Sequence, residues 1–268
     1  MSRILYKYLD ITGAKYMIGA TKPLTQPNLQ FTNASQLNDP FDCHPNLVDY
    51  SDIPESERRG IPQDWYIKKE KIDALNLRND TWLCSLSKVN DSLLMWSHYC
   101  WNHSGVCVGM DLDKIMANVP GMGVGVIRIK PLVFEVQYQD ILIRPNKYHS
   151  PVDVWHYQLS TKSKDWEYEQ EVRLIIEKPN PQLAAFTPEQ AKEAKKDKNK
   201  IWDWKEIHHY MKLSGDCFES IYFGEKIDSA EKDKIIHFVR ENLNPDIKLY
   251  QMNIDEHAFR LKAELITE

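Results

Sequence analysis

Acidic residues alternate with other types in the stretch Trp166-Glu-Tyr-Glu-Gln-Glu-Val-Arg173. A strand of period two would place Glu169, Glu171 and Arg173 on one face and Val172, Leu174 and Ile176 on the other. Neighbours on one strand face lie about 6.6 to 6.8 Å apart, so the two carboxylates could hold a sugar hydroxyl and a developing cation together. The alternative is a solvated strand face whose charges only keep the sheet soluble, and the pattern alone does not decide between the two.

A second candidate is the ring-rich segment from Met95 to His103. Its residues Trp96, His98 and Tyr99 are predicted to lie on a helix, where they could line a pocket for nicotinamide or a base. The alternative is a packed core, with His98 as a hydrogen-bonded histidine and not a base.

Hydroxyl and amide groups occur in two further places. The turn Asn38-Asp39-Pro-Phe-Asp42 could support the hydroxyls of a ligand, or its side chains could bind only their own backbone. Ser85 and Ser87 share a strand face, but no Gly-x-Ser-x-Gly elbow surrounds them, which argues against a serine nucleophile.

The metal-ligating residue types do not form a recognisable motif. Cys100, His103 and Cys107 are spaced loosely like zinc ligands, but they lack a fourth partner at the usual spacing. We therefore expect no metal.

These groups must be positioned by a mixture of strands and helices. Hydrophobic and turn patterns predict one α+β domain over residues 1–268, with helical insertions at about 53–80 and 187–212. The predicted strands are 4–8, 29–32, 81–87, 106–110, 125–129, 132–138, 168–176, 220–223 and 248–254, and the other predicted helices are 12–19, 93–101 and 230–243.

Composition excludes several classes of protein. The 34 basic and 39 acidic residues leave a formal net charge of −5, which argues against bulk nucleic-acid binding. No apolar run is long enough to span a membrane, and the N-terminus is not a signal peptide, so no membrane partner is expected. Five scattered cysteines are typical of reduced cytoplasmic thiols. The few glycines form neither a dinucleotide-fold fingerprint nor a P-loop.

Five segments in this order resemble a bacterial family, the domain of unknown function 2971. They are Leu5-Tyr-Lys-Tyr8, Asn38-Asp-Pro-Phe-Asp42, Leu94-Met-Trp-Ser-His-Tyr99, the stretch from Lys162 to Arg173, and Ile221-Tyr-Phe-Gly224. The resemblance covers most of the chain, but the family name carries little function with it.

The order of a first strand with tyrosine, a Ser-x-Ser strand and a late Glu-x-Glu strand is also similar to that of mono-ADP-ribosyltransferases. This resemblance implies a mixed, mainly antiparallel split sheet with flanking helices. One departure is that Tyr6, Lys7 and Tyr8 stand where those enzymes have arginine or histidine.

The same resemblance implies an enzyme that cleaves the nicotinamide–ribose bond of NAD, its substrate, and transfers ADP-ribose to an unknown acceptor. Glu171 would stabilise the oxocarbenium cation and Glu169 would orient or deprotonate the acceptor. The residues implied to contact NAD are Tyr6, Lys7, Asn38, Asp39, Ser85, Ser87, Trp96, His98, Tyr99 and Arg173. Such an enzyme would be a toxin or an anti-phage effector.

Two alternatives remain open on the sequence alone. One is a non-enzymatic module of a defence or regulatory system that senses a nucleotide or other ligand in the same aromatic and acidic pocket. The other is a hydrolase or nuclease in which Asp39, Asp42, Glu169 and Glu171 bind magnesium, because carboxylates suit hard cations.

Overall fold

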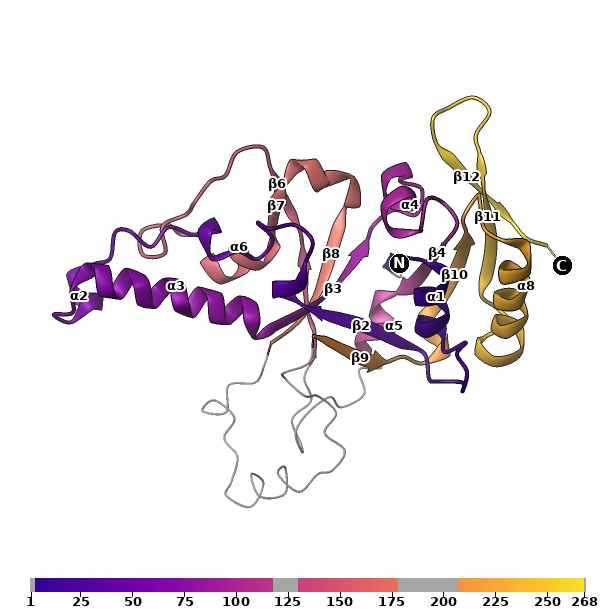
Figure 1. Cartoon of the computed structure of the whole chain (residues 1–268), viewed down its shortest axis with the longest axis horizontal. Helices are drawn as coiled ribbons and strands as arrows, with labels where there is room; N and C mark the ends of the chain where they lie inside the picture. Colours follow the sequence, from indigo (N-terminus) through magenta and orange to yellow (C-terminus); the bar gives the residue numbers. More distant parts are fainter. Residues whose placement is uncertain (1–2, 118–129, 178–206, 268) are drawn as a thin grey trace, which may run out of the picture.

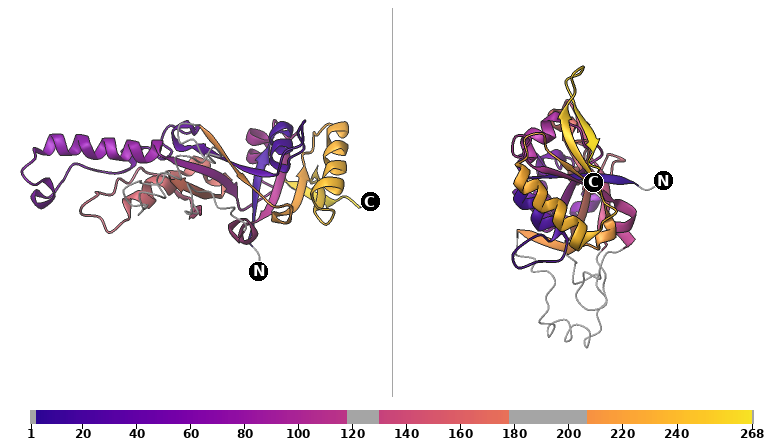
Figure 2. Two further views of the ribbon diagram at one scale, coloured as in Figure 1. Left: turned by 90° about the horizontal axis from the view of Figure 1, so that it is seen from below. Right: turned by 90° about the vertical axis from the view of Figure 1, so that its right-hand side faces the viewer.

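The structure is a computed structural model that describes residues 3–117, 130–177 and 207–267. Within these ranges the α+β class is confirmed, since a ten-stranded, mainly antiparallel sheet is flanked by helices. The molecule is elongated, with α3 at one end and β11, β12 and α8 at the other (Figures 1 and 2). No helix of the described ranges is both long and apolar enough to cross a membrane.

The strand order is β12-β11-β10-β4-β1-β3-β2-β9, and β8 pairs with both β3 and β5. The strands of this sheet are β1 (Ile4–Leu9), β2 (Asn28–Asn33), β3 (Thr81–Ser87), β4 (Val106–Asp111), β5 (Leu132–Glu135), β8 (Glu171–Glu177), β9 (His208–Lys212), β10 (Phe218–Phe223), β11 (Lys248–Ile254) and β12 (Leu261–Leu265). A separate pair consists of β6 (Gln137–Gln139) and β7 (Thr161–Ser163).

The helices lie on both faces of the sheet. They are α1 (Ile11–Ile18), α2 (Glu55–Arg58), α3 (Gln63–Asn79), α4 (Leu93–Tyr99), α5 (Leu112–Ala117), α6 (Val154–Ser160) and α8 (Ser229–Phe238), which continues into a π-helix, Val239–Leu243. The main core lies on the face that carries Val172, Leu174 and Ile176, where α1, α5 and α8 pack. The period-two interpretation of these three residues is therefore confirmed.

The sheet is split along one edge of β3. Near the end of β3, Ser87 pairs with Tyr6 of β1. Near its start, Trp82 and Leu83 pair with Asn33 and Thr32 of β2. Between these two contacts the Lys7 ammonium crosses the gap and donates to the carbonyl oxygen of Ser85 at 2.8 Å. The other edge of β3 pairs with β8 along its whole length.

Several predicted boundaries need correction. The strand predicted over 168–176 begins only at Glu171, because residues 164–169 form a 3₁₀ helix and Gln170 turns the chain with a φ of 43°. The strand predicted over 132–138 is interrupted at Val136. The insertion at 53–80 is helical as predicted, whereas His208–Lys212, at the end of the second insertion, is strand β9. The strand predicted at 125–129 and residues 187–206 of the second insertion lie outside the described residues.

The central position of β8 gives a test of the core. Leu174 is fully buried, so Leu174→Ala is expected to lower the free energy of unfolding by about 2 to 5 kcal/mol in urea denaturation. Leu142→Ala, at an exposed loop leucine, is the matched control and should change it by less than about 0.5 kcal/mol. Equal effects at the two positions would contradict the assignment of β8 to the core.

Candidate active site

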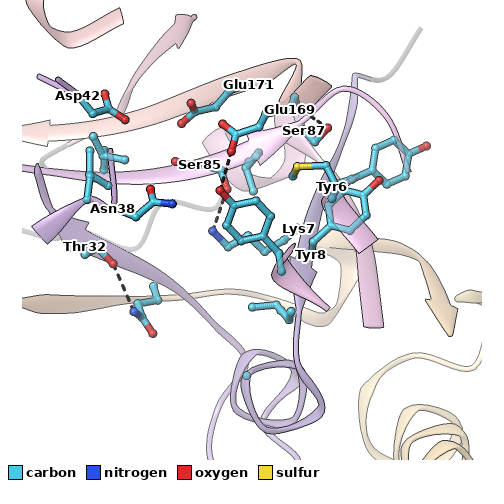
Figure 3. Close-up of a pocket in the computed structure, with 18 of the residues that line it drawn as sticks. Tyr6, Lys7, Tyr8, Thr32, Asn38, Asp42, Ser85, Ser87, Glu169 and Glu171 are labelled. Atoms are coloured by element: carbon cyan, nitrogen blue, oxygen red, sulfur yellow. Dashed lines mark hydrogen bonds between the residues drawn. The ribbon is translucent and has the colours of Figure 1, made fainter. Parts of the chain in front are cut away.

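A cavity of about 550 Å³ lies at the split in the sheet (Figure 3). It is lined by residues of β1, β2 and β3, by α4, and by the segments that carry Asn38, Asp42, Lys162, Glu169 and Glu171. The first and second halves of the chain therefore meet in one hollow.

The structure brings most of the predicted site residues to this cavity. Its lining includes Tyr6, Lys7, Asn38, Ser85, Ser87, Tyr99, Glu169 and Glu171. The solvated-face alternative for the late acidic residues does not hold, since Glu169 and Glu171 are only 4% and 3% exposed.

Four residues implied to contact NAD do not line the cavity. Trp96 is a core residue that packs edge-on against Tyr8, and its indole donates to the carbonyl oxygen of Asn90. His98 instead contacts the Tyr168 hydroxyl at 3.0 Å from its Nδ1. Asp39 caps its own turn by accepting from the Phe41 amide at 2.9 Å.

Arg173, the fourth of these residues, is fully buried behind the cavity. Its guanidinium donates to Asp42 Oδ2 at 2.8 Å, to Glu171 Oε1 at 2.9 Å and to the carbonyl oxygen of Leu159 at 2.8 Å. An ionised group is held so far from water only when it is paired and hydrogen-bonded, as Arg173 is. Arg173 therefore fixes two carboxylates and is not free to bind a ligand.

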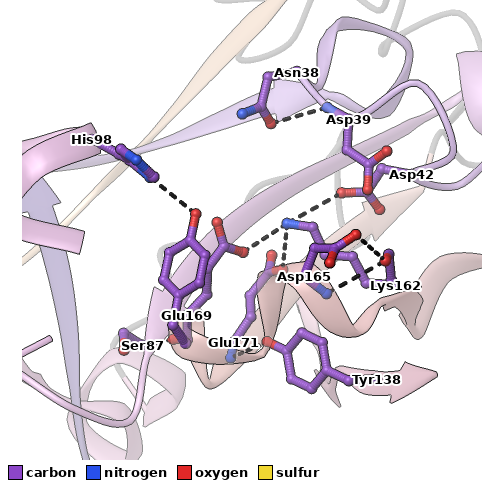
Figure 4. Close-up of polar contacts among 12 residues, drawn as sticks. Asn38, Asp39, Asp42, Ser87, His98, Tyr138, Lys162, Asp165, Glu169 and Glu171 are labelled. Atoms are coloured by element: carbon purple, nitrogen blue, oxygen red, sulfur yellow. Dashed lines mark hydrogen bonds and ion pairs between the residues drawn. The ribbon is translucent and has the colours of Figure 1, made fainter. Parts of the chain in front are cut away.

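Lys162 is the main site residue that the sequence did not single out. It lies on β7, and its ammonium is 2.6 Å from Glu169 Oε2, 3.5 Å from Glu171 Oε2 and 3.7 Å from Asp42 Oδ2 (Figure 4). The ammonium also lies 4.6 Å from the centre of the Trp166 ring. A lysine in a three-residue strand gives no periodic signal, so only the folded structure reveals its partners.

The charges of this group determine its ionisation. Burial alone would raise the pKa of Glu171, but Arg173 and Lys162 outweigh it and lower that pKa to about 2. Burial opposes the charge of Lys162, but its carboxylate neighbours outweigh that cost and raise the pKa of Lys162. We call the five residues Asp42, Lys162, Glu169, Glu171 and Arg173 the ion cluster.

Hydroxyl groups bind the carboxylates from the cavity side. The Tyr99 hydroxyl donates to Glu169 Oε1 at 2.6 Å, and the Ser85 hydroxyl is hydrogen-bonded to Glu171. Burial and the charge of Glu169 raise the pKa of Tyr99, so its hydroxyl keeps its proton. Tyr99 and Lys162 thus hold Glu169 at the cavity wall, where its carboxylate can accept from a ligand.

The candidate metal ligands make other contacts in the structure. Lys162 occupies the centre of Asp42, Glu169 and Glu171, and Asp39 binds its own turn. Cys100 and Cys107 are buried in the core beside α4. Within residues 3–117, 130–177 and 207–267, no three His, Cys, Asp or Glu side chains are grouped to hold a metal ion.

The buried pairing of Arg173 can be tested by its removal. Arg173→Met is expected to lower the free energy of unfolding by about 3 to 5 kcal/mol, because Asp42 and Glu171 would lose a buried counter-charge. Urea denaturation measures this, with Arg260→Met as the control, since the Arg260 side chain is exposed. An Arg173→Met protein as stable as the control would refute the structural role of the guanidinium.

Comparison with known proteins agrees with one of the two resemblances. No curated protein and no solved structure matches the chain. A family model described as "Protein of unknown function (DUF2971)" matches residues 95–174, which run from α4 to the ion cluster. Over these residues the match supports the resemblance to this family that the sequence indicated.

Proposed function

We propose that the chain is an ADP-ribosyltransferase-like enzyme that cleaves the nicotinamide–ribose bond of NAD. The observation that carries this proposal is the cavity at the split of the sheet, where the carboxylates of Glu169 and Glu171 meet hydroxyl and ring groups of β1, β3 and α4. A cavity of about 550 Å³ with few polar anchors is typical of small-molecule sites.

The chemistry follows from the charge that develops in the reaction. When nicotinamide leaves with the electron pair of the bond, the ribose carbon becomes an oxocarbenium cation. A carboxylate about 4 Å away stabilises this cation by roughly 4 kcal/mol at an effective dielectric near 20, which is about a thousandfold in rate. The acceptor then forms a bond to the same carbon and releases its proton.

The cavity offers a cation for the diphosphate of NAD and ring surface for its nicotinamide. The Lys7 ammonium lines the cavity and donates one hydrogen bond to the carbonyl oxygen of Ser85. Its other N–H groups can donate to the diphosphate. The side chains of Tyr6, Tyr8 and Tyr99 supply ring surface near the nicotinamide.

A second candidate function is a module that senses a nucleotide without cleaving it. The tight pairing of Glu171 with Arg173 favours this candidate, because a carboxylate already neutralised stabilises a new cation less well. The two functions share the cavity and differ only in whether the bond breaks.

NAD labelled in its nicotinamide ring distinguishes the candidates. We expect the purified chain to release labelled nicotinamide and Tyr99→Phe to release it at least tenfold more slowly, because Glu169 loses a hydroxyl donor. Tyr210→Phe, at an exposed tyrosine of β9, is the matched control and should keep the full rate. Binding without release would support the sensor, and neither binding nor release would refute both.

A further inference from the structure

The two glutamates of the cavity differ in how many acceptor positions are still open. Glu171 Oε1 accepts from Arg173 Nε at 2.9 Å, and its Oε2 accepts from Arg173 Nη2 at 3.0 Å. The Ser85 hydroxyl and the Lys162 ammonium bind the same carboxylate. A carboxylate offers about four lone-pair positions, so Glu171 has none left for a ligand.

Glu169 has half of its capacity open. It accepts one hydrogen bond from the Tyr99 hydroxyl and one from the Lys162 ammonium, both at 2.6 Å. Both donors line the cavity, so a ligand that reaches them also reaches Glu169. In the view of Figure 3, Glu169 lies between Glu171 and Lys7, and all three residues line the cavity.

The charge balance points to the same residue. The ion cluster holds three carboxylates and two cations, which leaves one net negative charge. Arg173 pairs with Asp42 and Glu171, whereas Glu169 depends on a lysine that it shares with both. The least compensated charge at the cavity wall therefore belongs to Glu169, and an electron-poor group of the ligand would be attracted to it.

We propose that Glu169 is the catalytic residue that contacts the ligand, and that Glu171 is a positioning residue that acts through Lys162 and Arg173. This assignment rests on the proposed function, and it gives Glu169 the cation-stabilising role that the resemblance to ADP-ribosyltransferases implies for Glu171. Glu169 accepts a ribose hydroxyl in the bound state and faces the cation as nicotinamide leaves. When the acceptor bonds to the ribose carbon, its proton passes to Glu169 and then to water.

Glutamine substitutions separate the two roles. At position 169 the amide oxygen can accept from Lys162 and the amide nitrogen can donate to the Tyr99 oxygen, so the fold is retained. At position 171 one amide oxygen would have to replace four acceptor positions, and the amide nitrogen would face the Arg173 guanidinium or Lys162. Glu171→Gln is therefore expected to be the less stable protein.

The first measurement is NAD cleavage at low temperature, where both variants are folded. Glu169→Gln should melt close to the wild-type temperature yet cleave NAD roughly a hundredfold more slowly. Glu171→Gln should melt lower and keep the larger part of the rate. Its KM for NAD should stay at the wild-type value, because Glu171 does not contact the ligand. A stable Glu169→Gln protein with the wild-type rate would overturn the assignment.

The second measurement needs no NAD cleavage. A water-soluble carbodiimide with a small amine labels accessible carboxyl groups at mildly acidic pH, and peptide mapping by mass spectrometry locates the label. We expect label on Glu169 and none on Glu171, whose low pKa and full pairing keep it unreactive. Label on Glu171 ahead of Glu169 would overturn the assignment, whether or not the wild-type chain cleaves NAD. A chain that left NAD intact would refute only the proposed enzymatic activity.

Discussion

The buried guanidinium of Arg173 is the interaction on which the site depends. It joins the turn that carries Asp42 to strand β8, and these positions are 131 residues apart in the chain. Breaking such a buried pair is costly, because each remaining charge would be left without a partner in a medium that solvates it poorly. The guanidinium therefore fixes where Glu171 lies, and through Lys162 it also fixes Glu169.

The split of the sheet supplies the space beside these charges. A continuous sheet would satisfy the backbone groups along β3, whereas the gap between its contacts with β1 and β2 leaves the Ser85 carbonyl to Lys7. The gap thus replaces a backbone donor with a charged side chain that lines the cavity. The interruption in strand pairing therefore places Lys7 in the cavity wall, and the ion cluster places Glu169 and Glu171 there.

The sequence predicted the parts of the fold that periodicity governs. The alternation at Val172, Leu174 and Ile176 identifies the core face of β8. Alternation could not identify the start of β8, since Glu169 lies in a 3₁₀ helix and Gln170 adopts a positive φ. Glu169 and Glu171 still approach each other, but through the shared Lys162 and not through a common strand face.

The candidate site was predictable only in part, because its partners are distant in sequence. Hydroxyl and carboxylate types identified Ser85, Tyr99 and Glu169, which line the cavity. Ring content alone did not distinguish Trp96, a core residue, from Tyr99, a site residue on the same helix. The pairing of Arg173 with Asp42 and Glu171 leaves no local pattern, so its structural role appears only in the fold.

The most direct test of the central claim is a crystal structure of the chain with ADP-ribose bound. We predict the terminal ribose in the cavity at the split of the sheet, with a hydroxyl within hydrogen-bonding distance of Glu169 and Arg173 still bound to Asp42 and Glu171. A ribose bound outside the cavity, or one bound to Glu171 with Arg173 displaced, would contradict the account.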